Sequence, residues 1–284
     1  MWELSFLGID LYHIAGWFWI YSFLGWIWET SYVSFLDKKF VNRGFVSGPV
    51  LTIYGLGAVI LYVFLHKLSQ KPVILYFSGV IIATLLEYIT AVLMEKIFNA
   101  SWWDYTDKKF NFRGKICLQS SIAWGFFTLL LIYVLHPFVS FIFDALPKTA
   151  GELIISLITI IYAVDFGISV IAALNLKDKL KSLDDMREEF AAFLKKLKLT
   201  EIVEEFKKPL DSIKRESRVN KIKERFEKTK ENLSKRVNKH NSKSEILSRF
   251  DLLTKKYIKS RNKLDRTTKR YLKAYPKLKI KRKK

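Results

Sequence analysis

The stretch DKKFVNRGFVSGPVLTIYG, residues 37–55, recurs without a gap seventy positions later as DKKFNFRGKICLQSSIAWG, residues 107–125. Both copies share a DKKF block, an Arg-Gly pair and a final glycine, and Tyr54 corresponds to Trp124. Each copy lies between two long apolar segments, which predicts a repeated unit of helix, polar loop and helix in a membrane. In membrane proteins with such repeats, the functional site lies between the two units. Tyr54 and Trp124 are therefore candidate site residues.

Charge is distributed very unevenly along the chain. Residues 1–176 carry eleven basic and eleven acidic side chains, whereas residues 177–284 carry 37 basic and 16 acidic ones, which accounts for the whole formal charge of +21. The sequence thus predicts a transmembrane domain, 1–176, and a basic cytoplasmic helical tail, 177–284. The single cysteine, Cys117, excludes an intrachain disulfide and a zinc site made of cysteines.

Five segments are apolar and long enough to cross a bilayer, which takes about 20 residues. We place them at 12–36, 46–66, 72–97, 115–143 and 151–175. The expected fold is therefore all-α, a polytopic bundle of about five membrane helices. Repeat 1 would comprise about 12–66 and repeat 2 about 72–143, and the fifth helix would stand alone. We expect the second helix to open with Gly48-Pro49, because proline suits the first turn of a helix.

Lysine and arginine are concentrated in the two repeated loops and in the tail. Loops on the cytoplasmic side of a membrane are enriched in these residues. We therefore predict that the N-terminus lies outside the cell and that both loops and the tail are cytoplasmic. Both repeats then run in the same direction, which makes them parallel repeats.

The tail has the pattern of amphipathic helices and predicts a helical hairpin or a coiled coil. Its apolar residues have heptad spacing at Ile246, Phe250, Leu253, Tyr257, Leu264 and Tyr271. The last eight residues, KLKIKRKK, are expected to lack structure. Anionic lipid headgroups, a protein partner such as a second copy of the chain, and RNA all suit the charge. We favour lipid or self-association over nucleic acid.

Ionisable residues inside membrane spans are energetically costly and need a partner or a function. Glu29 lies in the cytoplasmic half of the first span, and Glu87 and Glu95 lie in the same half of the third. Arg43 and Arg113 come from the repeated loops at a similar depth. We predict that these five side chains form one cluster. Two interpretations remain open: structural ion pairs that hold the loops, and a site for substrate binding or coupling.

Further loop residues are candidates for the same site. Trp103 and Asp104 belong to a WWDY block, which is either part of an interfacial aromatic belt or part of the site. Asn42 and Asn111, with nearby glycines, predict sharp turns whose N–H groups bind an anion or simply shape the loop. Asp165, in the fifth span, is expected to bond to a neighbouring helix.

Several enzyme signatures do not occur in this sequence. There is no GxxxxGK[ST] nucleotide-binding loop and no HExxH, GxSxG or CxxC motif, and the four histidines lack the spacing of metal ligands. We therefore predict no catalytic residue of a known type, no metal and no cofactor, and we exclude an enzyme of the soluble type.

Three segments resemble the bacterial CmpB-like family of type IV ABC-transporter permeases: YSFLGWIWET at 21–30, FVNRGFVSGPVLTIYG at 40–55 and SWWDYTDKKFNFRGKICLQSSIAWG at 101–125. The resemblance covers about residues 12–175. It implies a multi-pass protein of the bacterial cell membrane that acts in transport, with any ATPase as a separate subunit. It highlights Gly25, Trp26, Glu29, Asn42, Arg43, Gly44, Gly48, Pro49, Tyr54, Gly55, Trp103, Asp104, Asn111, Gly114 and Trp124.

Three functions are compatible with these features. The one we favour is a transport component with a charged and aromatic site at the cytoplasmic membrane interface. The second is a membrane-embedded enzyme that acts on a lipid or lipid-linked substrate, with paired carboxylates as acid and base. The third is a membrane-anchored scaffold or sensor that works through its basic tail.

Overall fold

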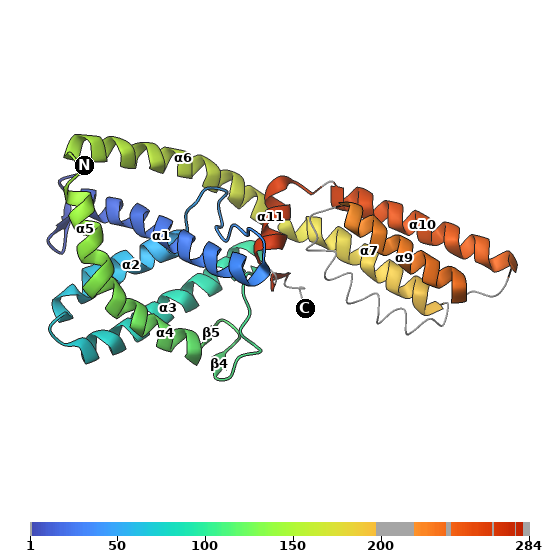
Figure 1. Cartoon of the computed structure of the whole chain (residues 1–284), viewed down its shortest axis with the longest axis horizontal. Helices are drawn as coiled ribbons and strands as arrows, with labels where there is room; N and C mark the ends of the chain where they lie inside the picture. Colours follow the sequence, from blue (N-terminus) through green and yellow to red (C-terminus); the bar gives the residue numbers. More distant parts are fainter. Residues whose placement is uncertain (1, 197–218, 237–239, 263, 276, 281–284) are drawn as a thin grey trace. The chain divides into compact units, whose positions relative to one another are not determined.

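The computed structural model describes residues 2–196, 219–236, 240–262, 264–275 and 277–280, and it is almost entirely helical (Figure 1). It confirms the all-α class. The elements of the first part of the chain are β1 (Ser5–Phe6), β2 (Ile9–Asp10), α1 (Leu11–Asp37), α2 (Thr52–Leu65), η1 (His66–Leu68), α3 (Pro72–Phe98), β3 (Ala100–Ser101), β4 (Asn111–Phe112), β5 (Ile116–Cys117), α4 (Leu118–Leu130), η2 (Leu131–Leu135), α5 (His136–Asp144) and α6 (Lys148–Leu174).

The ends of the long helices have ordinary chemical causes. Asp10 caps α1 by accepting a hydrogen bond of 2.9 Å from the backbone N–H of His13. The helix ends at Lys38, whose φ of 50° is left-handed, and α3 ends in the same way at Asn99, with a φ of 51°. Pro72 occupies the first turn of α3, where its missing N–H costs nothing.

The start of the second helix differs from the prediction. Helix α2 begins at Thr52 rather than at Gly48-Pro49. The backbone N–H of Gly48 donates to Asp165 of α6 at 2.7 Å, and that of Leu51 donates to the carbonyl of Ser22 in α1 at 2.8 Å. Because neighbouring helices satisfy these N–H groups, residues 38–51 form an irregular loop instead of extending the helix.

Helices α4 and α5 form one continuous rod through the π-helical turn η2. Pro137 lies directly after this turn. A proline has no N–H and its ring clashes with the carbonyl four residues earlier, so a locally widened helix accommodates it.

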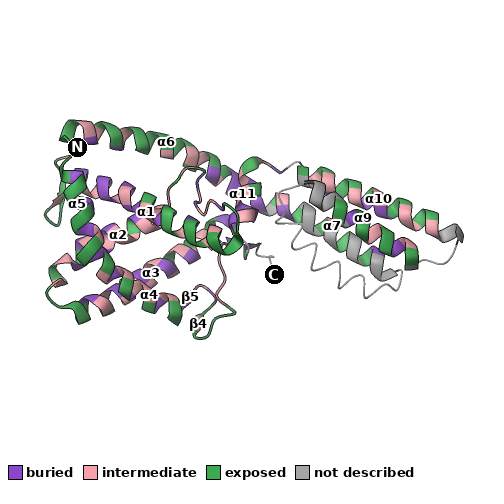
Figure 2. Cartoon of the chain, in the orientation of Figure 1, coloured by how far each residue is buried: buried purple, intermediate pink, exposed green. Residues whose placement is uncertain are grey.

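Three helices in the described part of the chain are long and apolar enough to cross a membrane: α3, the α4–α5 rod and α6. Much of their surface is exposed (Figure 2). On α6 the exposed side chains include Leu153, Ile160, Ile161 and Val164. Such apolar surface is unfavourable in water and suits lipid. Helix α1 is also 27 residues long, and η1 continues α2 to give a shorter apolar helix over Thr52–Leu68.

Four of the helices pack as two antiparallel pairs, α1 with α2 and α3 with α4. They surround a core rich in aromatic residues. Glycines allow the close approach. A Cβ on Gly55 would lie 2.4 Å from the carbonyl oxygen of Phe18, and a Cβ on Gly79 would lie 2.3 Å from the hydroxyl of Thr128.

Two sets of connections gather at opposite ends of these helices. At one end His13 lies 3.1 Å from Asp144, which joins the start of α1 to the end of α5. At the other end Phe45, in the first loop, packs against Phe98 and Phe166, with ring centroids 5.5 and 5.8 Å apart. The loop after α1, the end of α3 and the second half of α6 therefore share one end.

The described residues divide into two compact units, 1–171 with 277–284, and 172–276. The second unit contains α7 (Leu176–Lys196), α9 (Val219–Arg236), α10 (His240–Asn262) and α11 (Arg266–Ala274). Phe226 of α9 contacts Phe250 and Tyr257 of α10, with ring centroids 6.3 and 5.7 Å apart. The heptad seam does not continue along one helix as predicted, because α10 ends before Leu264 and Tyr271 lies on α11.

The expectation for the last eight residues was wrong for the part described. Lys279–Ile280 form strand β6, which pairs antiparallel with β3 in the loop after α3. Lys277 donates to the carboxylate of Asp107 and to the carbonyl of Asp104, at 2.8 and 2.9 Å. Residues 281–284 lie outside the described part.

Candidate functional site

Glu29, Arg43 and Tyr54 form what we call the Glu29 centre. Arg43 donates from Nε and Nη2 to Oε1 of Glu29 at 3.2 and 3.1 Å, and the hydroxyl of Tyr54 donates to Oε2 at 3.0 Å. Both charged side chains are mostly buried. A carboxylate with a guanidinium and a hydroxyl has its charge compensated and both oxygens satisfied.

Asn42 shapes the loop that carries Arg43. Its side-chain oxygen accepts hydrogen bonds from the indole N–H of Trp26 at 2.9 Å and from the backbone N–H of Gly44 at 2.8 Å. Its amide group donates to the carbonyl of Ser47 at 2.8 Å. Asn42 thus ties the loop to α1. Of the two alternatives for these N–H groups, binding an anion or shaping the loop, the N–H of Gly44 serves to shape the loop.

Glu87, Tyr105, Ser120 and Trp124 form the Glu87 centre. The hydroxyl of Tyr105 donates to Oε1 of Glu87 at 3.0 Å. The indole N–H of Trp124 and the hydroxyl of Ser120 donate to Oε2 at 3.0 and 3.4 Å. Glu87 is only 7% exposed, and no cation pairs with it among the residues that the structure describes.

The two centres meet through their aromatic residues. The rings of Tyr54 and Trp124 lie edge to face with centroids 5.9 Å apart. The hydroxyl of Tyr54 also donates to Glu29, and the indole N–H of Trp124 donates to Glu87. One chain of contacts therefore runs from Glu29 to Glu87. The sequence analysis named Tyr54 and Trp124 as candidate site residues because they occupy equivalent positions in the two repeated stretches.

Glu95 and Lys115 form a third, separate ion pair. The carbonyl of Lys115 accepts a hydrogen bond of 2.9 Å from the indole N–H of Trp103. Trp103 therefore holds the second loop beside the end of α3. This hydrogen bond does not connect Trp103 to the Glu29 centre or to the Glu87 centre. The carboxylates do not form the single cluster expected from the sequence.

Arg113, Asp104 and Asn111 also lie apart from both centres. Arg113 is exposed, has a φ of 53° and stacks over the ring of Phe112 at 5.4 Å. The carboxylate of Asp104 accepts from the N–H of Thr106 at 2.9 Å, and the side-chain oxygen of Asn111 accepts from the N–H of Gly114 at 3.1 Å. These polar groups organise the loop itself.

Two partners of Glu87 were missed by the sequence reasoning, Tyr105 and Ser120. Tyr105 was part of the WWDY block, but a tyrosine there suits an interfacial belt equally well. In the structure, burial and the neighbouring Glu87 carboxylate raise the pKa of the Tyr105 hydroxyl above its usual value, so this hydroxyl remains a donor at neutral pH. Nothing in the sequence distinguishes Ser120 from other serines.

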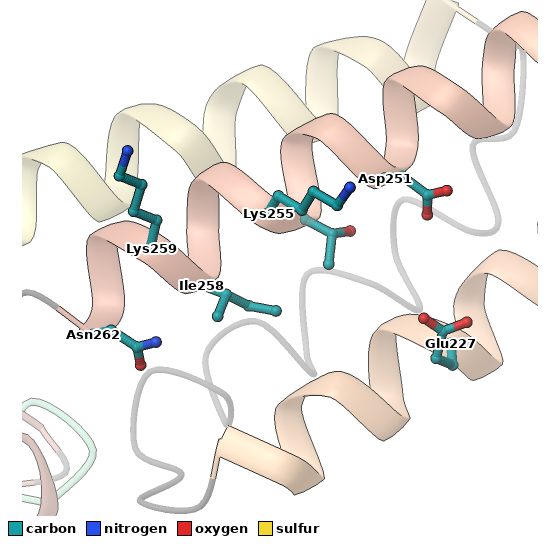
Figure 3. Close-up of a pocket in the computed structure, with 7 residues that line it drawn as sticks. Glu227, Asp251, Lys255, Ile258, Lys259 and Asn262 are labelled. Atoms are coloured by element: carbon teal, nitrogen blue, oxygen red, sulfur yellow. The ribbon is translucent and has the colours of Figure 1, made fainter.

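The second unit, residues 172–276, which we call the tail unit, has a hollow between α9 and α10 (Figure 3). Two acidic and two basic side chains contribute to its lining, and Asp251 is already paired with Lys230 at 2.7 Å. A mixed and partly neutralised lining favours no ligand class. It is lined by Glu227, Asp251, Thr254, Lys255, Ile258, Lys259 and Asn262.

Comparisons with known proteins place the first unit, residues 1–171 with 277–284, in a family, and we call it the membrane unit. No curated protein and no solved structure matches the chain. A sequence model of one family matches residues 16–170, which is more than half of the chain and includes both glutamate centres. The chain therefore belongs to the family described as "Putative ABC-transporter type IV".

Proposed function

We propose that this chain is a transport component of the bacterial cell membrane. Five helices would cross the membrane: α1, α2, α3, the α4–α5 rod and α6. Membership of an ABC-transporter family and three candidate spans support the proposal. Helix α1 has 27 residues, or about 40 Å at 1.5 Å per residue, which exceeds the roughly 30 Å of the hydrocarbon core. The sequence has no nucleotide-binding loop, so the ATPase would be a separate chain.

We assign the end that carries residues 38–51 and 99–117 to the cytoplasm, and the N-terminus to the outside. These loops hold seven of the eleven basic residues of positions 1–176, and the strand β6 brings Lys277 to the same end. The positive-inside bias supports this orientation. The six basic residues of 277–284 would then face anionic lipid headgroups, while self-association remains the alternative for the tail.

The two helix pairs would be parallel repeats. Glu29 and Tyr54 on α1 and α2 correspond in this interpretation to Glu87 and Trp124 on α3 and α4, since each pair shares one hydrogen bond of 3.0 Å. Antiparallel packing within each pair gives both repeats the same direction.

The observation that carries the proposal is the contact between Tyr54 and Trp124. It joins two glutamates from different helix pairs at the end where both loops lie. In transporters, coupling and substrate groups lie between repeats that move against each other. A contact that both repeats share is a suitable place for such coupling. The enzyme alternative is less well supported, because both oxygens of Glu29 are already engaged, one by Arg43 and the other by Tyr54.

Solute profiling of cells tests this function without knowledge of the substrate. Cells that lack the chain are compared with cells that carry wild type, Tyr54→Phe/Trp124→Ala or the control Gly57→Ala, where a Cβ meets nothing within 4 Å. We expect the same solutes to change in the deletion and in the double variant, at equal membrane protein levels, and not in the control. If no solute changes in the deletion, or if the double variant restores all of them, the proposal is wrong.

A further inference from the structure

Glu87 differs from Glu29 and Glu95, the other two glutamates of α1 and α3, in how its charge is balanced. Glu29 pairs with Arg43 and Glu95 pairs with Lys115. Glu87 is the only aspartate or glutamate among the buried residues that the structure describes. Its three partners, Tyr105, Trp124 and Ser120, are neutral. A buried carboxylate without a countercharge is costly in a membrane, and binding a proton removes that cost.

The partners of Glu87 can satisfy both the charged and the protonated form. A charged carboxylate accepts from all three. A protonated one keeps the indole N–H of Trp124 on its carbonyl oxygen, because an indole can only donate. Its new O–H can donate to a hydroxyl, since Tyr105 and Ser120 both donate and accept. Ser120 has a second acceptor for its own proton, the carbonyl of Cys117 at 2.9 Å.

The titratable groups that face this position come from every element around it. Tyr105 lies in the second loop, and Cys117 precedes α4 with its sulfur 3.5 Å from the hydroxyl of Ser120. Beyond the Tyr54–Trp124 contact lies Glu29, whose charge is matched by Arg43. The surroundings therefore bring Glu87 hydroxyl groups and a thiol, while Arg43, beyond the Tyr54–Trp124 contact, is paired with Glu29.

We propose that Glu87 is a proton-binding site of the membrane unit, charged and protonated in turn, while Glu29 is the structural ion-pair partner of Arg43. The inference deepens the proposed function because it names a proton as the ligand of one of the two centres. It rests on that function only for the use made of the proton, since proton binding is measurable without transport.

The test is infrared difference spectroscopy of the full chain in lipid nanodiscs, titrated with pH. Because the chain has 27 aspartates and glutamates, the spectrum of Glu87→Gln is subtracted from that of wild type at each pH. We expect the difference to contain a carbonyl band of a protonated carboxylic acid that grows as the pH falls, and we expect the matched control Glu29→Gln to retain this component. Tyr105→Phe removes a donor to the charged form and should move the midpoint of the band to higher pH. Circular dichroism establishes that each variant is folded.

Titrating carbonyl bands that are identical in folded wild type and folded Glu87→Gln would overturn the assignment. Either result leaves the transport proposal standing, because solute profiling does not depend on protonation. Conversely, a band assigned to Glu87 in a protein whose deletion changes no solute would retain the proton site and reject transport.

Discussion

The Glu29 centre and the Glu87 centre are built alike and balanced differently. In each, a glutamate of one long helix accepts a hydrogen bond of 3.0 Å from an aromatic residue of the next helix. Glu29 also has a guanidinium partner, whereas Glu87 has hydroxyl and indole donors only. The comparison teaches that the same residue type can fix a loop when its charge is matched and can respond to pH when it is not.

The largest expected effect comes from breaking the compensated charge. Glu29→Ala removes the carboxylate that pairs with the largely buried Arg43, and such losses cost on the order of 3 kcal/mol. Glu87→Gln keeps donors around a neutral amide and should cost about 1 kcal/mol or less. Thermal unfolding in one detergent measures both. Equal costs would break the comparison between the centres.

A second expected effect separates the two helix pairs by the rigidity of their contacts. Gly55→Ala places a Cβ 2.4 Å from the backbone oxygen of Phe18, which cannot move away freely. Gly125→Ala meets the side chains of Tyr76 and Val80, which can shift. We expect Gly55→Ala to cost about 2 kcal/mol and Gly125→Ala less. Gly57→Ala, in open space, is the control, and thermal unfolding that ranks Gly125→Ala above Gly55→Ala would contradict the packing.

A smaller effect compares the two aromatic donors. Tyr54→Phe leaves Glu29 with its Arg43 partner, so the cost should stay below about 1 kcal/mol. Trp124→Phe removes a donor from an uncompensated carboxylate, and its cost of about 1.5 kcal/mol should rise with pH because the donor favours the charged form. Unfolding measured across a pH series checks this. A cost that is independent of pH argues against a titrating Glu87.

The smallest effect uses Asp265 of the tail as a reference for a compensated carboxylate outside the membrane. Burial works against its charge, but hydrogen bonds from Lys179 and Thr268 outweigh burial and lower its pKa to about 2. Its stabilisation is therefore present above about pH 4 and is lost as the pH falls towards 2. Because the side chain is 40% exposed, Asp265→Asn should cost less than about 1 kcal/mol at neutral pH.

Far-UV circular dichroism during acid titration measures this difference. Wild type should lose helix more steeply than Asp265→Asn between about pH 4 and pH 2. Parallel curves for the two proteins would show that Asp265 contributes nothing through its charge.

The helices and the Glu29 centre were accessible from the sequence for physical reasons. Long apolar segments have few alternatives to a helix in a membrane, which explains why α1, α3 and α6 lie where they were predicted. Arg43 lies in the loop directly after α1, only 14 residues beyond Glu29, so the chain brings the two charges together.

The Glu87 centre was less predictable because the second connection is longer. Glu29 and Tyr54 are 25 residues apart, whereas Glu87 and Trp124 are 37 apart. The additional residues place Tyr105, rather than an arginine, on the carboxylate and leave Arg113 exposed on a strand turn. The similarity between the two loops therefore predicts where each loop lies in the fold, but it does not predict which side chain of the loop contacts the glutamate.

The end of the chain was unpredictable for a related reason. In the run KLKIKRKK, Leu278 and Ile280 alternate with lysines, but this pattern spans too few residues to predict a strand by itself. Strand β6 forms where β3 offers an edge to pair with, and that distant partner is not visible in the local sequence.

Cross-linking across the contact between Tyr54 and Trp124 is the most direct test of the proposal that the two centres meet. Tyr54→Cys and Trp124→Cys are combined in a Cys117→Ala background, with a protease site added in the 66–71 connection, and native membranes are treated with a short thiol cross-linker. The account predicts that the two fragments stay joined after cleavage, and that a Gly57→Cys/Trp124→Cys control separates. Fragments that separate in both proteins would contradict a meeting of the two centres.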